Sequence, residues 1–313
     1  MENKKKILVI GSANIDLTMS MNKLPEVGET VIDDGGVAYI PGGKGANAAI
    51  ALHRLGAEVV FCTKLGADMH GQKLYSFYKE EGLDTSYIKV DREMPTGLAV
   101  VMRDLEGNNR IVVYPGANST ISQECIAESF DCAPDAVYLG FEIPFNMVVY
   151  AANLASERNI PIFIDAAPAN RDFELEALPP VELFSPNETE TLEFTGVSPT
   201  SMDNTLRAAI AILRRVKAKN VVIKQGTRGA FYYDGKGYYN TFPTVRVDKT
   251  VDTTAAGDAF TAAMTLEYLR SGDVKSAIKY GNVAGAITVT RPGASSSIPT
   301  FEEVEAYIHA NKI

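Results

Sequence analysis

The sequence predicts an α/β protein with a mostly parallel central sheet, helices on both faces of that sheet, and a small second sheet. Between residues 136 and 224, apolar runs that resemble buried strands alternate with helical patterns, which is typical of parallel βαβ units. From 17 to 40 the chain instead shows short extended pieces broken by proline and glycine, which indicates strands outside the main core. In the first region we expect strands at 136–139, 162–164, 183–184 and 221–224, and helices at 145–158 and 202–216.

Composition limits the possible partners. With 313 residues, 46% of them hydrophobic and 22% charged, the chain suits one large α/β domain with an appendage, or two domains. The net charge of -9 argues against a nucleic-acid partner, which needs a basic surface. Cys62, Cys125 and Cys132 lack metal-ligand spacing and fit the reduced thiols of a cytoplasmic protein. The apolar run at 7–10 is too short for a signal peptide, and no stretch reaches the roughly 18 apolar residues of a membrane span.

The first expected strand, at 7–10, ends at the polar segment GSANID. Ligands usually lie just beyond the carboxyl ends of strands in an open sheet. Asn14 and Asp16 are therefore candidates to hold hydroxyl groups of a ligand, although an Asx turn would also explain them.

The next motif, PGGKGANAAIAL, places two glycines before a helix that we expect to end near Gly56. It is not a Walker loop, because Lys44 is followed by glycine rather than serine or threonine. The glycines, Gly43 included, would let backbone amides approach a ligand at which Lys44 and Asn47 point. A glycine-rich turn before a helix can also be purely structural.

Farther along, the pattern predicts a strand after 59, a helix at 72–81 and another strand reaching 90. Two extended runs at 97–103 and 110–114 are joined by the turn-forming residues 104–109 and predict a hairpin. We expect this hairpin to complete the small sheet. Stretches 16–40 and 97–115 would then form a lid inserted in the α/β core, and lids exclude water from reacting groups.

Polar residues follow each strand of the 136–224 region, and clustering at strand carboxyl ends is what a ligand crevice requires. Each loop alone would also fit a solvated connection. Glu190 is a candidate to hold Mg²⁺ through water, since that ion binds few protein carboxylates directly. The polar residues are Glu142, Asp165, the NETE segment at 187–190 and the QGTRG segment at 225–229.

The segment VDTTAAGDAF, residues 251–260, opens an apolar helical run that extends to 269. A helix starting near Ala255, capped by the hydroxyl of Thr254 or Thr253, would expose backbone N–H groups that attract an anion such as phosphate. Asp258 beside such a cradle suggests phosphoryl transfer, with the carboxylate orienting the attacking hydroxyl as a base. The same residues also fit a tightly packed helix start whose dipole favours an acidic side chain. That dipole would lower the pKa of Asp258.

We expect a hairpin turn at 234–235 before this segment. After the segment we expect a helix at 273–291 and then an irregular loop at 291–297.

Together and in order, the motifs resemble those of the PfkB-type carbohydrate kinases, ribokinases among them, over essentially the whole chain. The most specific are PGGKGANAAIALHRLG and VDTTAAGDAF, supported by GSANID, GFEIP, SPNETE, IKQGTRG and PGANST.

The resemblance implies that residues 1–313 form one ribokinase-like, Rossmann-like kinase domain whose lid often pairs with that of a second subunit in a homodimer. It implies transfer of the γ-phosphoryl group of ATP to the primary 5-hydroxyl of D-ribose. Related kinases acting on deoxyribose, fructose or nucleosides are alternatives. The small-molecule partners would be the sugar and ATP, with Mg²⁺ and an activating monovalent cation, usually K⁺.

The resemblance also implies roles for individual residues. Asp258 would be the base, with the anion hole formed by the amides of Ala255, Ala256 and Gly257. The sugar would contact Asn14, Asp16, Gly43, Lys44, Asn47, Glu142 and Asp258. The nucleotide would be lined by Asn187, Lys224, Gly226, Thr227, Gly229, Gly257 and Asn282, while Glu190 would belong to the Mg²⁺ and phosphate motif. K⁺ would be held, partly through carbonyls, by Asp252, Thr254, Thr288, Arg291, Gly293 and Ser297.

Two segments depart from that family pattern and leave the sugar and the phosphate donor open. In GFEIP we expect a more polar lead-in to the glutamate, and in place of Lys224-Gln225 a small or hydroxyl residue. Two other classes of function remain. A dinucleotide-dependent oxidoreductase is disfavoured because no G-x-G-x-x-G follows the first strand. A catalytically inactive sugar-sensing protein would be free to lose Asp258 and the anion hole, and both are present.

Overall fold

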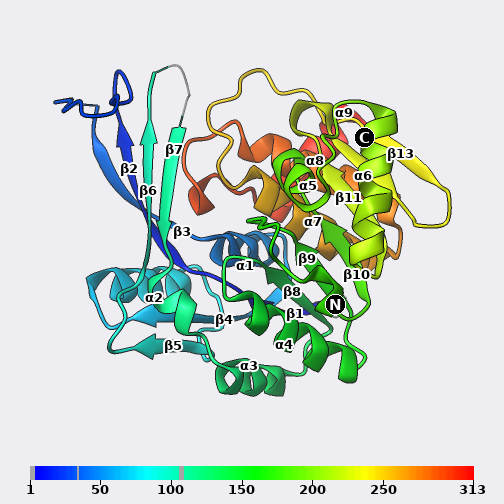
Figure 1. Ribbon diagram of the computed structural model, residues 1–313, viewed down its shortest axis with the longest axis horizontal. Helices are drawn as coiled ribbons and strands as arrows, with labels where there is room; N and C mark the ends of the chain where they lie inside the picture. Colours follow the sequence, from blue (N-terminus) through cyan, green and yellow to red (C-terminus); the bar gives the residue numbers. More distant parts are fainter. Residues whose placement is uncertain (1–3, 34, 106–108) are drawn as a thin grey trace.

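Two separate sheets organise the chain (Figure 1). The computed structural model describes residues 4–33, 35–105 and 109–313. The larger sheet has nine strands in the order β13-β12-β11-β10-β9-β8-β1-β4-β5. Their bounds are β1 Lys6–Ile10, β4 Glu58–Gly66, β5 Ile88–Asp91, β8 Ala136–Gly140, β9 Ile162–Asp165, β10 Val181–Ser185, β11 Ala218–Lys224, β12 Ala230–Tyr233 and β13 Tyr239–Phe242.

All neighbouring strands from β5 to β11 run parallel, and only β12 and β13 add an antiparallel edge through the predicted turn at 234–235. Parallel strands are covered on both faces, which is why they are continuous apolar runs. Along β1, Ile7 and Val9 pack into one core layer. Leu8 and Ile10 pack into the other. The predicted parallel α/β core is confirmed.

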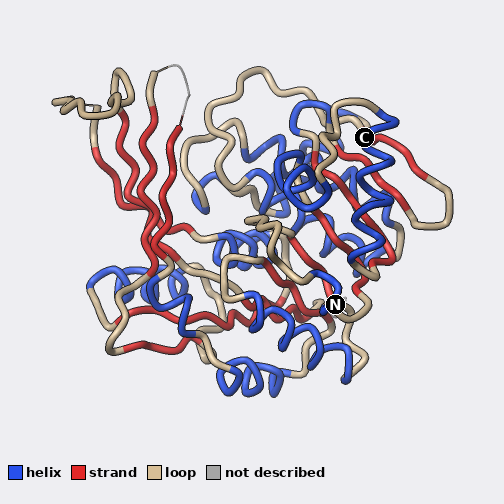
Figure 2. The backbone as a smooth tube through the Cα atoms, viewed as in Figure 1, coloured by secondary structure: helices blue, strands red, loops and turns tan. Residues whose placement is uncertain are grey.

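Helices cover both faces of the large sheet (Figure 2). One layer contains α1 Lys44–Arg54, α2 Met69–Glu80, α7 Ala256–Ser271, α8 Val274–Thr288 and α9 Phe301–Asn311. The opposite layer contains α3 Gln123–Ser129, α4 Phe145–Glu157, α5 Glu188–Thr195 and α6 Met202–Arg215. Because α7 packs against both α1 and α8, residues 258–266 are all buried, charged Asp258 included. None of the described helices is both long enough and apolar enough to cross a bilayer.

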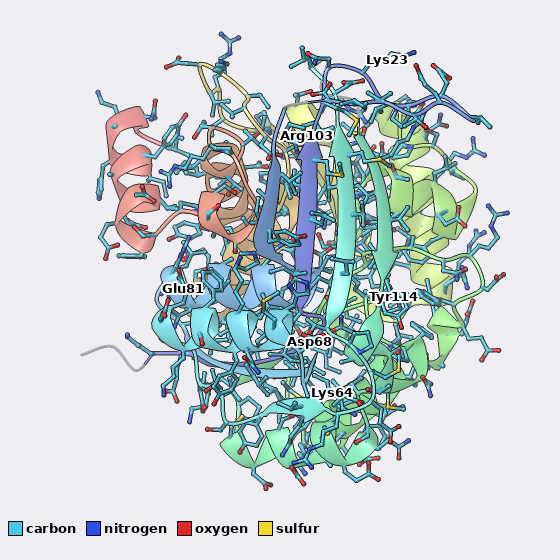
Figure 3. All side chains as sticks on the ribbon, turned by 90° about the vertical axis from the view of Figure 1, so that its left-hand side faces the viewer. Lys23, Lys64, Asp68, Glu81, Arg103 and Tyr114 are labelled. Carbon is cyan, nitrogen blue, oxygen red and sulfur yellow. The ribbon has the colours of Figure 1, made fainter. Side chains whose placement is uncertain are left out.

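The second sheet, called the small sheet below, has the order β3-β2-β6-β7 and stands beside the core (Figures 1 and 3). Its strands are β2 Asn14–Ser20, β3 Val37–Gly42, β6 Gly97–Arg103 and β7 Asn109–Tyr114. β2 pairs in parallel with β6, and the two outer pairs are antiparallel. The predicted turn between β6 and β7 lies partly outside the described residues.

Several boundaries differ from the prediction. α2 starts at Met69 because Asp68 caps it, accepting a hydrogen bond from the Gly71 amide at 2.8 Å. The helix predicted at 273–291 ends at Thr288. α9 was not predicted, although Thr300 and Glu303 form the capping box that announces a helix start.

Candidate active site

One large cavity, of about 1420 Å³, lies where the carboxyl ends of the parallel strands face the small sheet and the start of α7. The cavity brings together predicted residues from stretches of chain that are far apart in the sequence. They are Asn14, Asp16, Gly43, Lys44, Asn47, Glu142, Asn187, Glu190, Lys224, Gly226, Thr227, Gly229, Thr254, Ala255, Ala256, Gly257, Asp258 and Asn282. The other five residues of the predicted cation site, Asp252, Thr288, Arg291, Gly293 and Ser297, lie outside its lining.

The start of α7 differs from the predicted hydroxyl cap. The N-cap is Ala255, in the left-handed conformation with a φ of 61°, and no side chain caps the helix. The Thr254 hydroxyl instead donates to Asp252 Oδ1 at 2.7 Å. Among the described residues, no protein acceptor takes the N–H groups of Gly257 or Asp258. Of the three predicted anion-hole amides, that of Ala256 donates to Thr253 O at 3.3 Å, whereas those of Ala255 and Gly257 have no protein acceptor in the described part of the chain and are free to bind an anion.

Asp258 is held between two side chains of α1. Its Oδ2 accepts a hydrogen bond from Asn47 Nδ2 at 2.8 Å, and its Oδ1 lies 3.8 Å from Lys44 Nζ. Burial raises the pKa of the Asp258 carboxyl, and this effect outweighs the opposing influence of Lys44. The predicted lowering of this pKa is therefore wrong, because the helix dipole acts on a group that has lost its water. A raised pKa makes Asp258 a stronger proton acceptor than an exposed aspartate.

A second polar cluster surrounds Glu142. Glu142 Oε2 accepts hydrogen bonds from Ser12 Oγ at 2.5 Å, from Asn14 Nδ2 at 3.3 Å and from the Lys44 amide at 3.0 Å. Asn118 Nδ2 donates to Asn14 Oδ1 at 2.8 Å and fixes that amide. Ser12 and Asn118 belong to the GSANID and PGANST motifs, but no role was predicted for either residue.

Asp16, the third residue of β2, lies near this cluster. Burial, followed by the nearby carboxylates of Glu142 and Asp258, raises the pKa of Asp16 from 3.8 to about 7. The cluster can accept hydrogen bonds from several hydroxyl groups at once, which suits a polyhydroxylated ligand.

The first turn of α5 also lines the cavity and contains Glu190. The Glu190 amide donates to Asn187 Oδ1 at 2.8 Å, and the Asn187 amide donates to Glu190 Oε2 at 2.7 Å. Burial raises the pKa of Glu190, Lys224 opposes that rise and Asp165 adds to it. Asn282 Nδ2 donates to the carbonyls of Phe242 and Pro243, both at 3.1 Å. These side chains are thus held in place without a ligand.

Lys224 and Asp165 also line the cavity and form a largely buried ion pair. Lys224 Nζ lies 2.6 Å from Asp165 Oδ1 and 3.2 Å from Thr261 Oγ1. Tyr138 donates its hydroxyl to Asp165 Oδ2 at 3.4 Å. From the sequence, Asp165 is predicted only to follow a strand, because its partner Lys224 lies 59 residues away along the chain.

Two residues of the predicted cation site, Thr254 and Gly293, bond to a third, Asp252. The Thr254 amide and hydroxyl bond Asp252 Oδ1, and the Gly293 amide donates to Oδ2 at 3.1 Å. Arg103, from the far end of β6 (Figure 3), adds a two-pronged ion pair with distances of 2.8 and 3.0 Å. Burial opposes ionisation, but these donors outweigh it and hold the pKa of Asp252 at about 2.

The remaining cation-site residues have other partners in the protein. Thr288 O accepts from the Arg291 amide at 3.3 Å, and the Ser297 hydroxyl donates to Ala294 O at 2.7 Å. The Arg291 guanidinium pairs with Glu303 at 2.6 and 3.1 Å. In the described part of the chain, no three or more His, Cys, Asp or Glu side chains group as a metal site would require.

Comparisons with known proteins identify the family of the chain. The sequence model of the pfkB family of carbohydrate kinases matches residues 4–301. The chain is 33% identical to a ribokinase of Haemophilus influenzae, over 97% of this chain and 99% of that protein. It is 30% identical to a deoxyribokinase of Salmonella typhi, over 98% and 99% of the two chains. Among solved structures it is similar to an Arabidopsis thaliana ribokinase complexed with ribose and ATP, at 26% identity and a TM-score of 0.84, covering 97% and 98% of the chains.

Proposed function

The chain belongs to the PfkB family of carbohydrate kinases, and we propose that it phosphorylates D-ribose. In this reaction the γ-phosphoryl group of ATP moves to the primary 5-hydroxyl of ribose, giving ribose 5-phosphate and ADP. An ATP-dependent sugar kinase follows from the family. The observation that supports the chemistry is the buried Asp258 carboxylate beside the unpaired first-turn amides of α7.

In the proposed reaction, the sugar oxygen forms a bond to the γ-phosphorus while the bond from that phosphorus to the ADP oxygen breaks. Asp258 accepts the hydroxyl proton, and the amides at the start of α7 bind the phosphoryl oxygens. The charged neighbours of Asp258 matter here. The pKa of Lys44 is raised, chiefly by Asp258, so Lys44 stays an ammonium that attracts the incoming phosphate.

The choice of sugar rests on the Glu142 cluster and Asp16. A site built to hydrogen-bond a hydroxyl discriminates strongly against an analogue that lacks it, because its buried polar groups are left unpaired. The ribokinase and deoxyribokinase relatives leave ribose and deoxyribose as the two substrates to compare.

Two ions belong to the proposal. Mg²⁺ supplies charge neutralisation on the phosphates when bound, and the buried carboxylate of Glu190 suits a water-mediated contact with it. K⁺ would lie near Asp252, where Arg103 already pairs with the carboxylate, so we propose that backbone carbonyls supply most of its ligands. The cytoplasmic location expected from the free cysteines stays a prediction.

We also propose that the small sheet is a lid and a dimer surface. Its inner face lines the cavity with residues such as Val101 and Val113. Val100 pairs across the strands with Val112, so both belong to the opposite face, where Val112 is 64% exposed. Tyr39 and Tyr114 are also exposed there (Figure 3 labels Tyr114). An apolar outer face of this kind suits a second copy of the chain.

The proposal is tested by ADP release from Mg-ATP with D-ribose, 2-deoxyribose, fructose and nucleosides, in K⁺ and with K⁺ replaced by a large organic cation. Fast turnover on ribose that depends on K⁺ supports the whole proposal. Faster turnover on another sugar retains the mechanism and refutes the substrate. Sugar binding without turnover on any of them would identify a sensor.

A further inference from the structure

A buried lysine at the end of β11 lies beside the first turn of α7. Lys224 and Asp165 end the strands on either side of β10, and their side chains are only 11% and 5% exposed. A Cβ atom built on Gly257 would lie 3.8 Å from Lys224 Nζ. The ammonium group is therefore adjacent to the anion hole, with no side chain on Gly257 between the two.

The ammonium group still has one donor to give. A lysine ammonium carries three N–H donors. Among the described residues, Asp165 and Thr261 take two of them. Thr261 is itself fixed, because its hydroxyl donates to Gly257 O at 3.1 Å. Both partners thus hold the lysine against the turn where phosphate is expected.

Lys224 and Lys44 are the ammonium groups that neighbour the acidic side chains of Asp165, Glu190 and Asp258. A buried ion pair is weak evidence for a stabilising role, because desolvating two charges offsets most of their attraction. A pair placed at the anion hole is better explained by the charge that arrives there with a nucleotide.

On the basis of the kinase function proposed above, we propose that Lys224 is a further catalytic residue. Its free donor binds the phosphoryl group as that group passes from ADP oxygen to sugar oxygen. Asp165 and Thr261 are positioning residues that aim the ammonium group. Lys224 neither gives nor takes a proton, since the hydroxyl proton goes to Asp258.

The test compares two ligands that differ only at the γ-phosphate. Lys224→Met removes the ammonium group and keeps an unbranched side chain that reaches about as far as the lysine Cε. We expect calorimetry to show Mg-ADP binding within about twofold of wild type, and a non-hydrolysable Mg-ATP analogue bound at least about tenfold more weakly. We expect kcat to fall by about 10²–10³ with little change in the KM for sugar. Equal losses for both nucleotides, or an unchanged kcat, would overturn the proposal.

Matched variants separate this role from a structural one. Lys219→Met, on the same strand, removes an exposed pair with Glu182 outside the cavity and should leave all these values unchanged. Lys224→Met leaves the Asp165 carboxylate buried alone, so the double variant with Asp165→Asn removes both charges. If the double variant recovers both Tm and kcat, Lys224 only neutralises Asp165 and the proposal is wrong. If it recovers Tm alone, the proposal holds.

The single variant Asp165→Asn tests positioning. It keeps the ammonium group but removes its strongest anchor, so we expect a partial loss of the same preference for the ATP analogue over ADP. An unchanged preference would remove Asp165 from this role. These nucleotide measurements need no sugar. A wild-type protein that phosphorylates none of the sugars would refute the proposed function, whereas the nucleotide comparison would still test whether Lys224 binds the γ-phosphate.

Discussion

Replacing Asp16 by asparagine is expected to stabilise the protein at alkaline pH while damaging its activity. The pKa of Asp16 is about 7 in the folded protein and 3.8 for the unperturbed group. For an acid whose pKa is higher in the folded state, the contribution to stability is fully present below 3.8 and is lost as the pH rises through about 7. Asparagine cannot ionise, so the variant escapes that loss.

The magnitude follows from the difference of about 3 pH units at about 1.4 kcal/mol each, which sets an upper limit of about 4 kcal/mol. Solvent near the cavity screens part of this, so we expect Asp16→Asn to gain about 2–4 kcal/mol in the free energy of unfolding at about pH 8. At about pH 4 the gain should be close to zero. The loss of a charged acceptor for a sugar hydroxyl should lower kcat/KM for the sugar about 10- to 100-fold.

Urea denaturation of both proteins at the two pH values measures the effect, with Asp84→Asn as an exposed control. The side chain of Asp84 accepts a local hydrogen bond from the Ser86 amide, which asparagine can also accept. A variant less stable than wild type at about pH 8, or an equal difference at both pH values, would refute the electrostatic account of Asp16.

Three further changes test the site. Asp258→Ala should keep the fold and sugar binding but lose about 10²–10⁴ in kcat, and a near wild-type rate would remove Asp258 from the mechanism. Arg103→Gln should lower the free energy of unfolding by about 1–3 kcal/mol in urea titrations. The wild-type protein should lose stability as the pH falls from 3.8 towards the Asp252 pKa of about 2, and this loss should be smaller in the variant. An equal loss in both proteins would mean that the pair does not set this pKa. Val112→Glu should prevent dimer formation, so ultracentrifugation should show monomers of the variant and dimers of the wild type. A monomeric wild type would exclude the dimer.

Local patterns predicted the strands and most helices, because buried parallel strands and amphipathic helices carry their own periodicity. The misses at α7 have a different origin. The raised pKa of Asp258 depends on its burial where α1 packs against α7, which no local pattern encodes. The left-handed residue is an alanine, so the glycine or asparagine that would announce this conformation is missing. The α9 helix, by contrast, could have been predicted, because residues 300–303 of the sequence already form a capping box.

The motifs predicted which segments would meet, but the partners within them are long-range. Ser12 reaches Glu142 across 130 residues, and Arg103 reaches Asp252 across 149. Sequence separation hides such pairs, and the arginine carries no motif of its own. Only the paired register of β2 with β6 brings Arg103 level with Ser20 at the far end of the small sheet.

The two faces of the small sheet belong to the same strands, and β2 begins at Asn14, which contacts Glu142 in the cavity. A ligand on the inner face and a partner on the outer face would therefore contact the same strands. Binding free energies that share a structural element are linked reciprocally. If a second copy on the outer face tightens sugar binding by some factor, sugar must tighten the association of the two copies by that same factor.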